Sequence, residues 1–229
     1  MKTMDNQQQH ILVINPNSNE SVTEGLSREL RGFHFSEGPV IKCVSLPDGP
    51  FSIESQADIE AVTLPLRKIV SESRNVDAFV IACYSDPGLH VCREASEKPV
   101  FGIQECGILT AMSRGDRFGV IALQERSIRR HLRYLRQIGV MERLAGERAA
   151  GLSVGESVSG KYTFEKLLAA AKQLRDSDQA DTIILGCAGM ASHRAKLESA
   201  IGIPVISPVQ AAVSMAMHSL LTTQQYEKS

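Results

Sequence analysis

Short apolar runs alternate with helical patterns along almost the whole chain. Continuous apolar runs predict strands at 11–15, 40–46, 77–83, 99–103, 117–123, 182–187 and 204–208. Between them, helical periodicity predicts helices at 19–31, 54–73, 125–139, 164–177, 192–202 and 209–221. An Asn or Ser should cap the first helix, and Pro65 should interrupt or bend the second. Residues 140–160 are expected to hold one strand and a Gly/Ser loop. Apolar strands separated by helices are typical of parallel sheets that helices cover on both faces.

Three features of this pattern recur in the same order. "DAFVIAC" and "DTIILGC" end 104 residues apart, at Cys83 and Cys187, and "KPVFGIQE" and "IPVISPVQ" begin 105 apart. "ILVIN" and "FGVIA" are 107 apart. A shared fold alone produces some repetition, but it does not readily explain two cysteines in register. We therefore predict an α/β fold of two pseudo-symmetric Rossmann-like halves with parallel sheets, residues 1–109 plus 207–229 and residues 110–206, with the active site in the cleft between them.

Composition narrows the class of protein. With 43% hydrophobic and 22% charged residues and a net charge of −1, the chain is typical of a soluble globular protein and has no basic stripe for nucleic acid. Its apolar runs are far shorter than the roughly 20 residues of a membrane span. The polar N-terminus "MKTMDNQQQH" lacks the apolar segment of a secretory signal. We expect a cytoplasmic protein with a small-molecule substrate and no nucleic-acid or membrane partner.

The five cysteines form no C-x-x-C pair, so neither a disulfide framework nor a zinc site is expected. Cys43 and Cys92 are interpreted as core residues, while Cys106 follows a strand and has no evident partner. Cys83 and Cys187 differ because each ends an apolar run and precedes small residues that open a helix. Ligands of open parallel sheets bind at such strand ends, and a helix N-terminus lowers the pKa of a nearby thiol.

Two opposed, acidified thiols suit one kind of chemistry. A thiolate removes a proton from one face of a carbon, and a thiol returns a proton to the other face, as in a racemase or epimerase. Asn15 and Asn17, in "INPNSN", follow the first predicted strand and are expected at the same edge of the sheet as the thiols. The Asn15 side chain either offers its amide to a substrate or only shapes the turn.

Four segments resemble hydantoin racemases, a branch of the aspartate/glutamate racemase superfamily, in order from about 11 to 220. They are "INPNSNESVTEGL", "GPFSIES", "ACYSDPGLHVCREASEKPVFGIQE" and "ILGCAGM". The resemblance implies racemisation of a 5-substituted hydantoin or allantoin-like ring by two cysteines, which match Cys83 and Cys187, without cofactor or metal. It also implies a homo-oligomer. The substrate-binding residues that we predict are Asn15, Ile53, Tyr84, Ser85, Ala188 and Gly189.

The chain departs from the family pattern at Tyr84 and Ser85, where Phe and an acidic residue are frequent, and at 122–123 and 207–208. These positions bear on which substrate fits. Alternative functions are another carbon-acid racemase, a maleate-type cis–trans isomerase, a decarboxylase, or a non-catalytic protein that binds a ring metabolite. A decarboxylase needs only one proton donor, and a non-catalytic binding protein needs no thiol. The presence of both cysteines therefore counts against these two alternatives.

Two further patterns carry less chemistry. "GLSVG" matches the G-x-S-x-G nucleophile motif, but no apolar strand precedes it, so Ser153 is not interpreted as a nucleophile. Five arginines fall within 125–139 and are interpreted as a solvated face or an oligomer contact. Asp86 is expected to cap or shape its turn, and His193 to lie in a cap or at the surface.

Overall fold

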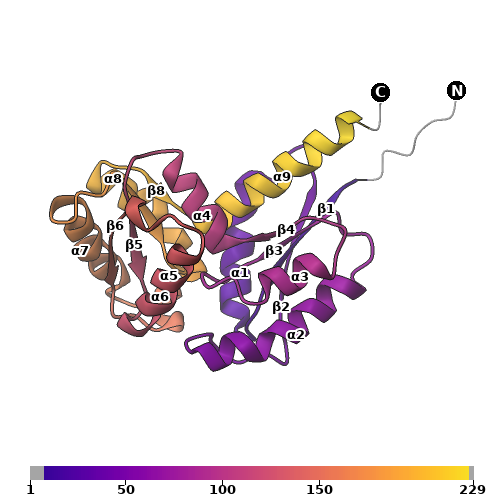
Figure 1. Ribbon diagram of the computed structural model, residues 1–229, viewed down its shortest axis with the longest axis horizontal. Coiled ribbons are helices and arrows are strands. Elements are labelled where there is room, and N and C mark those ends of the chain that lie inside the picture. The colour runs from indigo at the N-terminus through magenta and orange to yellow at the C-terminus, as the bar shows by residue number, and fades with distance from the viewer. Residues whose placement is uncertain (1–7, 227–229) are drawn as a thin grey trace, which may run out of the picture.

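Two four-stranded parallel sheets form the frame of the molecule, a computed structural model that describes residues 8–226 (Figure 1). In the first sheet the strand order is β2-β1-β3-β4, and in the second it is β6-β5-β7-β8. Every strand pair is parallel. The strands of the first sheet are β1 (His10–Asn15), β2 (Val40–Ser45), β3 (Ala78–Ile81) and β4 (Val100–Gly102); those of the second are β5 (Phe118–Ala122), β6 (Leu144–Ala149), β7 (Thr182–Leu185) and β8 (Val205–Ile206). The α/β fold of two similar parallel halves is thus confirmed.

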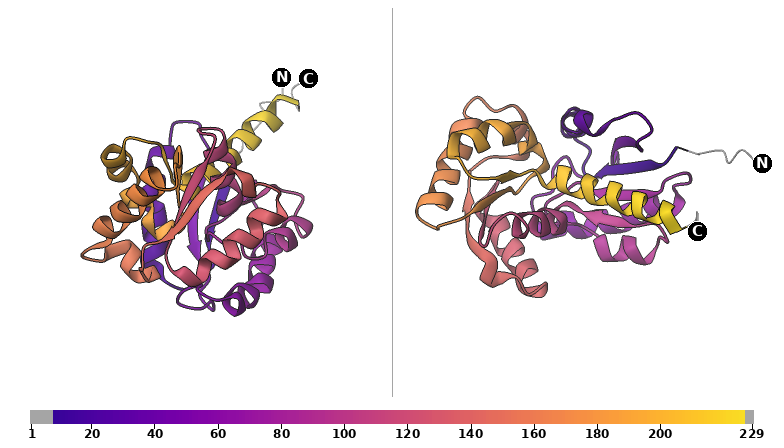
Figure 2. Two further views of the ribbon diagram at one scale, coloured as in Figure 1. Left: turned by 60° about the vertical axis from the view of Figure 1, so that its left-hand side comes forward. Right: turned by 90° about the horizontal axis from the view of Figure 1, so that it is seen from above.

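Helices flank both sheets and connect their strands (Figures 1 and 2). The α-helices are α1 (Glu20–Glu29), α2 (Gln56–Glu72), α3 (Leu89–Glu94), α4 (Ile103–Met112), α5 (Glu125–Gln137), α6 (Val154–Ser159), α7 (Thr163–Asp176), α8 (Arg194–Ile201) and α9 (Pro208–Tyr226). Short 3-10 helices are η1 (Leu30–Phe33), η2 (Met141–Arg143) and η3 (Ala188–His193). After the second sheet the chain returns as α9, which lies along β1, β3 and β4 of the first sheet.

The same backbone hydrogen bond follows the corresponding strands β3 and β7 of the two sheets. The residue after β3, Ala82, donates its N–H to the carbonyl of Ile14 at 2.8 Å. The residue after β7, Gly186, donates in the same way to Ile121 at 2.8 Å. Because Cys83 and Cys187 each come next, the two thiols occupy corresponding positions in the two halves.

One apolar cluster joins the halves. It includes Val80 of β3, Val120 of β5 and Ile184 of β7, together with Ile108 of α4 and Val213 of α9. Two further clusters lie on the outer sides, one beneath α2 and α3 and one beneath α7 and α8. The halves therefore share a core, and the boundaries at 109/110 and 206/207 stay a prediction.

The polar ends of the first two helices follow from the sequence. The Asn19 side chain accepts the N–H of Ser21 and caps α1. Ser55 and Asp58 form a capping box at the start of α2. Pro65 does not interrupt this helix, since α2 runs continuously from Gln56 to Glu72, and a bend at Pro65 stays a prediction.

Two helices were absent from the sequence interpretation. The first, α4, follows β4 without a loop, and its cap comes from a distant residue. The second, α6, lies in the region expected to hold only a strand and a loop. It begins at Ser153, whose hydroxyl accepts the N–H of Glu156 in a capping box. Ser153 is therefore a helix cap, although a strand, β6, does precede it in a segment that is not a continuous apolar run.

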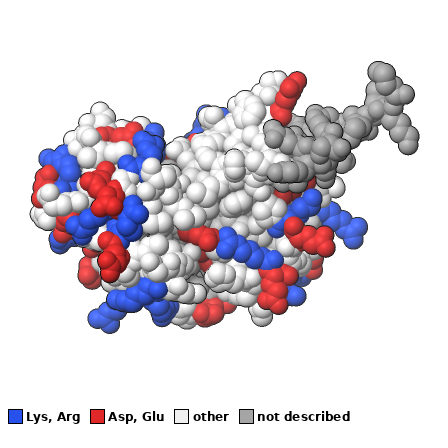
Figure 3. Space-filling model, turned by 45° about the horizontal axis from the view of Figure 1, so that its top comes forward, with Lys and Arg blue, Asp and Glu red and all other residues white. Residues whose placement is uncertain are grey.

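The face in Figure 3 carries both signs of charge interspersed, in keeping with the net charge of −1. In the part of the chain that the structure describes, no helix combines the length and apolar character that crossing a membrane requires.

Candidate active site

Cys83 and Cys187 line one cavity between the two halves. Each thiol lies two residues beyond the end of a central strand, Cys83 after β3 and Cys187 after β7. Parallel strands direct their carboxyl ends to one edge of the sheet, which is where such folds bind ligands. The two sheets turn these edges toward a common cavity of about 60 Å³.

Four of the other predicted site residues also line this cavity: Ile53, Tyr84, Ser85 and Ala188. Gly189 is not among the lining residues, although its N–H donates to Sγ of Cys187 at 3.4 Å. The apolar wall includes Val22, Leu123, Leu152 and Val154, of which the sequence pointed only to position 123. Those residues come from three separate segments, and only the fold brings them together.

Asn15 lies beneath the cavity rather than in its wall. It is fully buried, and its Nδ2 lies 2.9 Å from Oδ1 of Asn17 and 3.0 Å from Oγ1 of Thr23. Asn17, two residues later, is the one that lines the cavity. Asn15 therefore supports the loop that presents Asn17, and direct contact of Asn15 with a substrate stays a prediction.

Burial dominates the ionisation of Cys83. Loss of solvent raises its pKa to about 12, and the neighbouring Cys187 and Asp86 act in the same direction. The Ser85 amide and the Arg130 guanidinium lower the pKa in part. The expectation that a helix N-terminus lowers the pKa of Cys83 is wrong, because α3 begins only at Leu89, too far along the chain to cap Cys83.

Cys187 has closer polar neighbours. Its sulfur accepts the Gly189 N–H and lies 3.9 Å from Oγ of Ser157, which in turn donates to the carbonyl of Val154 at 2.6 Å. These contacts lower the pKa of Cys187, but burial outweighs them and raises it overall. A Cβ at Gly189 would meet Oγ of Ser157 at 2.3 Å, so the close approach requires glycine here.

These pKa shifts predict how Cys83 reacts with iodoacetamide. Below a pKa of about 12 the thiolate is the minor form, so the alkylation rate of Cys83 should rise about tenfold per pH unit from roughly pH 7 to pH 10, without a plateau. Arg130→Met should slow alkylation at each pH, because it removes the cation that lowers the pKa. Peptide mass spectrometry separates Cys83 from Cys187. A plateau below pH 9 would contradict this account.

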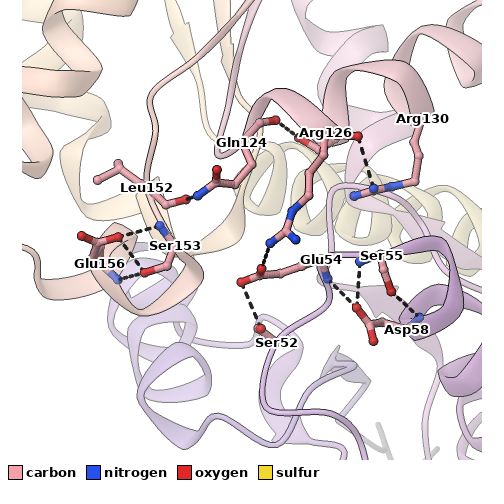
Figure 4. A network of polar contacts seen from close by, with 11 residues as sticks. Ser52, Glu54, Ser55, Asp58, Gln124, Arg126, Arg130, Leu152, Ser153 and Glu156 are labelled. Atoms are coloured by element: carbon pink, nitrogen blue, oxygen red, sulfur yellow. Dashed lines mark hydrogen bonds and ion pairs between the residues drawn. The ribbon is translucent and has the colours of Figure 1, made fainter.

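The arginine-rich helix α5 faces the cleft. Arg126 forms an ion pair with Glu54 of the first half, and Figure 4 shows the two side chains meeting across the gap. Arg133 donates to Oε1 of Gln56 at 2.6 Å, and Arg130 lines the cavity. Four of the five arginines are exposed, which agrees with a solvated face, although Arg126 and Arg133 also contact the first half. A helical wheel alone cannot reveal these contacts, because the partner comes from a distant segment. The oligomer contact stays a prediction.

A buried His–Glu pair lies behind Tyr84. Nδ1 of His131 forms a hydrogen bond with Oε1 of Glu147. The Tyr84 and His131 rings meet edge to face, with centroids 5.1 Å apart. His131 also lines the cavity. The carboxylate at Nδ1 orients the imidazole ring beside the cavity. No local motif pointed to this pair.

Asp86 caps a helix other than its own. Its two carboxylate oxygens accept the N–H groups of Gln104 and Glu105 in the first turn of α4, both at 2.9 Å. Burial nonetheless raises the pKa of Asp86 to about 7. The sequence placed the role of Asp86 in its own turn, whereas its side chain caps α4, which explains how α4 can begin directly after a strand.

Gly102 makes room for this cap. A Cβ at Gly102 would lie 2.3 Å from the Asp86 carboxylate, so Gly102→Ala should lower the free energy of unfolding by about 1–3 kcal/mol. Urea denaturation measures the change. Gly25→Ala is the matched control, because its added methyl meets nothing within 4 Å in the middle of α1 and should not destabilise. Equal stability of the two variants would contradict the packing argument.

The remaining cysteines lie elsewhere. Cys92 is fully buried and Cys43 packs against the core, which confirms both interpretations. Cys106 is also a core residue and does not line the cavity. His193 stands at the start of α8, near the ring of Phe164.

Comparisons with known proteins agree with this arrangement. The family model "Asp/Glu/Hydantoin racemase" matches residues 11–216. Hydantoin racemase from Rhizobium meliloti is 38% identical over 212 residues, 90% of this chain and 87% of that protein. Hydantoin racemase from Paenarthrobacter aurescens is 35% identical over 211 residues, 90% of this chain and 89% of that protein.

The structure of allantoin racemase from Klebsiella pneumoniae superimposes with a TM-score of 0.89. The match is 30% identical in sequence and covers 95% of this chain and 89% of that one. Since the family model spans most of the chain and the relatives exceed 30% identity over nine-tenths of it, the chain belongs to the Asp/Glu/Hydantoin racemase family.

Proposed function

We propose that the protein racemises a 5-substituted hydantoin or an allantoin-like ring by proton transfer between Cys83 and Cys187. The observation that carries the proposal is the position of these thiols, which occupy equivalent strand ends and line one cavity. The hydantoin and allantoin racemases among its relatives support the class of substrate.

The reaction uses groups that the cavity supplies. The substrate C5 lies between the thiols, next to a ring carbonyl, so its C–H is acidic for a carbon. The thiolate of one cysteine takes the C5 proton, and the electron pair of that bond moves onto the carbonyl oxygen as an enolate. The thiol of the other cysteine then protonates the opposite face of C5. The cysteines finish with their roles exchanged, and proton exchange with water restores them.

The environment of the thiols sets the proton chemistry. Burial raises the pKa values of Cys83 and Cys187, so at neutral pH the thiol form dominates and can donate a proton. Arg130 is the cation that lowers the pKa of Cys83. It therefore favours formation of the catalytic thiolate and stabilises negative charge on an enolate nearby. This route needs no cofactor or metal.

The lining favours a neutral ring over an amino acid. The wall is largely apolar, with Val22, Ile53, Leu123, Leu152 and Val154. The acidic side chain at the cavity, Glu54, is already paired with Arg126. A zwitterionic amino acid would need a partner for its ammonium group, whereas a hydantoin needs only hydrogen bonds along its edges.

Incubation of single enantiomers tests the function. In D₂O, single enantiomers of allantoin and of several 5-alkyl hydantoins should lose optical rotation and their C5–H signal far faster with the protein than without it. If only an amino acid reacts, the substrate class is wrong. If no carbon acid reacts, the protein is not a racemase of this kind. Cytoplasmic location and homo-oligomer assembly stay predictions, and size-exclusion chromatography with light scattering checks the latter.

A further inference from the structure

A second cavity adjoins the catalytic cavity and is considerably larger. Its volume is about 290 Å³, compared with about 60 Å³ for the cavity of the two cysteines. Ser85, Arg130 and His131 line both, so the cavities meet at these residues. We call the larger one the side cavity. It lies between α2, α3, α4 and α5, and its wall includes Leu89, Gln104 and Tyr134.

Two buried N–H donors at the side cavity have no hydrogen-bond partner among the described residues. They are Nε2 of Gln104 and Nε of Arg130. Gln104 is only 2% exposed, so solvent does not satisfy its amide. A buried donor without a partner costs about 1–3 kcal/mol, and folded proteins rarely leave one unless a water or ligand completes it.

Asp86 fixes the backbone from which the Gln104 side chain extends. The backbone N–H of Gln104 donates to Oδ1 of Asp86, and the backbone N–H of Glu105 donates to Oδ2 of the same carboxylate. Asp86 comes directly after Ser85, which lines both cavities. The segment that carries Cys83 therefore also positions the backbone of Gln104 at the side cavity.

Building on the proposed function, we infer that the side cavity receives the C5 substituent of the substrate, and that Gln104 selects a substituent with an amide or ureido group. The small catalytic cavity holds the reacting ring, so a longer substituent has to leave it past Ser85. A ureido group offers both a carbonyl oxygen and N–H groups. It therefore complements the Gln104 amide in either orientation of that amide, while its oxygen can also accept from Nε of Arg130.

Two substrates with different substituents test this inference. Gln104→Leu should lower kcat/KM for allantoin, which carries a ureido group, by about tenfold or more. The same variant should leave kcat/KM for 5-isobutylhydantoin within about twofold of wild type. Glu105→Gln is the control variant, because Glu105 is the next residue of α4 and pairs with Arg93 outside both cavities. It should leave both substrates unchanged.

A second variant tests the route between the cavities. Ser85→Val keeps the backbone amide but narrows the junction, so it should lower kcat/KM for allantoin and isobutylhydantoin more than for 5-methylhydantoin, whose substituent does not reach the junction. Equal losses for allantoin and isobutylhydantoin in Gln104→Leu, with a wild-type melting temperature, would overturn the inference and leave the proposed racemase standing. A wild-type protein that racemises none of these rings would overturn both.

Discussion

Replacing either Cys83 or Cys187 with serine is expected to lower the kcat/KM for racemisation by about 10²–10⁴-fold, the contribution of a positioned acid or base. A serine hydroxyl is a far weaker acid than a thiol, so it neither forms the base nor returns the proton at a useful rate. Both residues line the cavity, and Cys187 also packs against the outer apolar cluster of the second half. Polarimetry of a single hydantoin enantiomer measures the loss.

The control for this prediction is Cys43→Ser, since Cys43 packs against the core of the first half and lies outside the cavity. It should retain wild-type racemisation. The two active-site variants should lose activity to a similar degree, because each enantiomer needs one cysteine as base and the other as acid. A Cys83→Ser or Cys187→Ser protein that racemises at the wild-type rate contradicts the two-thiol mechanism.

His131→Leu is expected to lower the free energy of unfolding by about 3–5 kcal/mol, the range for breaking a buried polar pair. The side chains of His131 and Glu147 are only 4% and 1% exposed. Among residues 8–226, Oε2 of Glu147 already has no hydrogen-bond partner, so removing the imidazole leaves both carboxylate oxygens buried and unpaired there. Urea denaturation followed by circular dichroism measures the change.

The double variant His131→Leu/Glu147→Leu separates pairing from packing. It removes the buried carboxylate together with its partner, so it should recover part of the stability that His131→Leu loses. His34→Leu, on the exposed segment before β2, is the surface control and should change stability by less than about 0.5 kcal/mol. A His131→Leu protein as stable as this control would show that the pair contributes little.

The repeat in the sequence anticipated the frame of the fold because strand cores are local. β3 and β7 are continuous apolar runs that are buried throughout, and their signal needs no partner. The sequence did not predict α4, whose first turn is capped by Asp86. This residue lies eighteen positions before Gln104, whose backbone N–H it accepts. Such a cap cannot be read from local periodicity. For a related reason Pro65 does not interrupt α2, since packing maintains the helix through a residue that disfavours it.

For the candidate site, the sequence located the residues that lie at the ends of the central strands. It placed Cys83, Tyr84, Ser85 and Ala188 correctly at one cavity, because each lies next to a strand whose direction was predictable. It missed His131, whose partner Glu147 comes from another element. It also misjudged the thiol pKa values, because helix ends are visible in a sequence but the degree of burial is not.

The position of deuterium in the two enantiomers tests the central claim most directly. A single enantiomer of a slowly self-racemising 5-alkyl hydantoin is incubated with the protein in D₂O and stopped at low conversion. Chiral chromatography with mass spectrometry then gives the deuterium content of each enantiomer. Two opposed thiols predict a product enantiomer that carries deuterium at C5, because its new proton comes from the second, solvent-exchanged thiol, and remaining substrate that keeps protium. A product that retains the original proton would show that one base serves both faces, and would contradict the account.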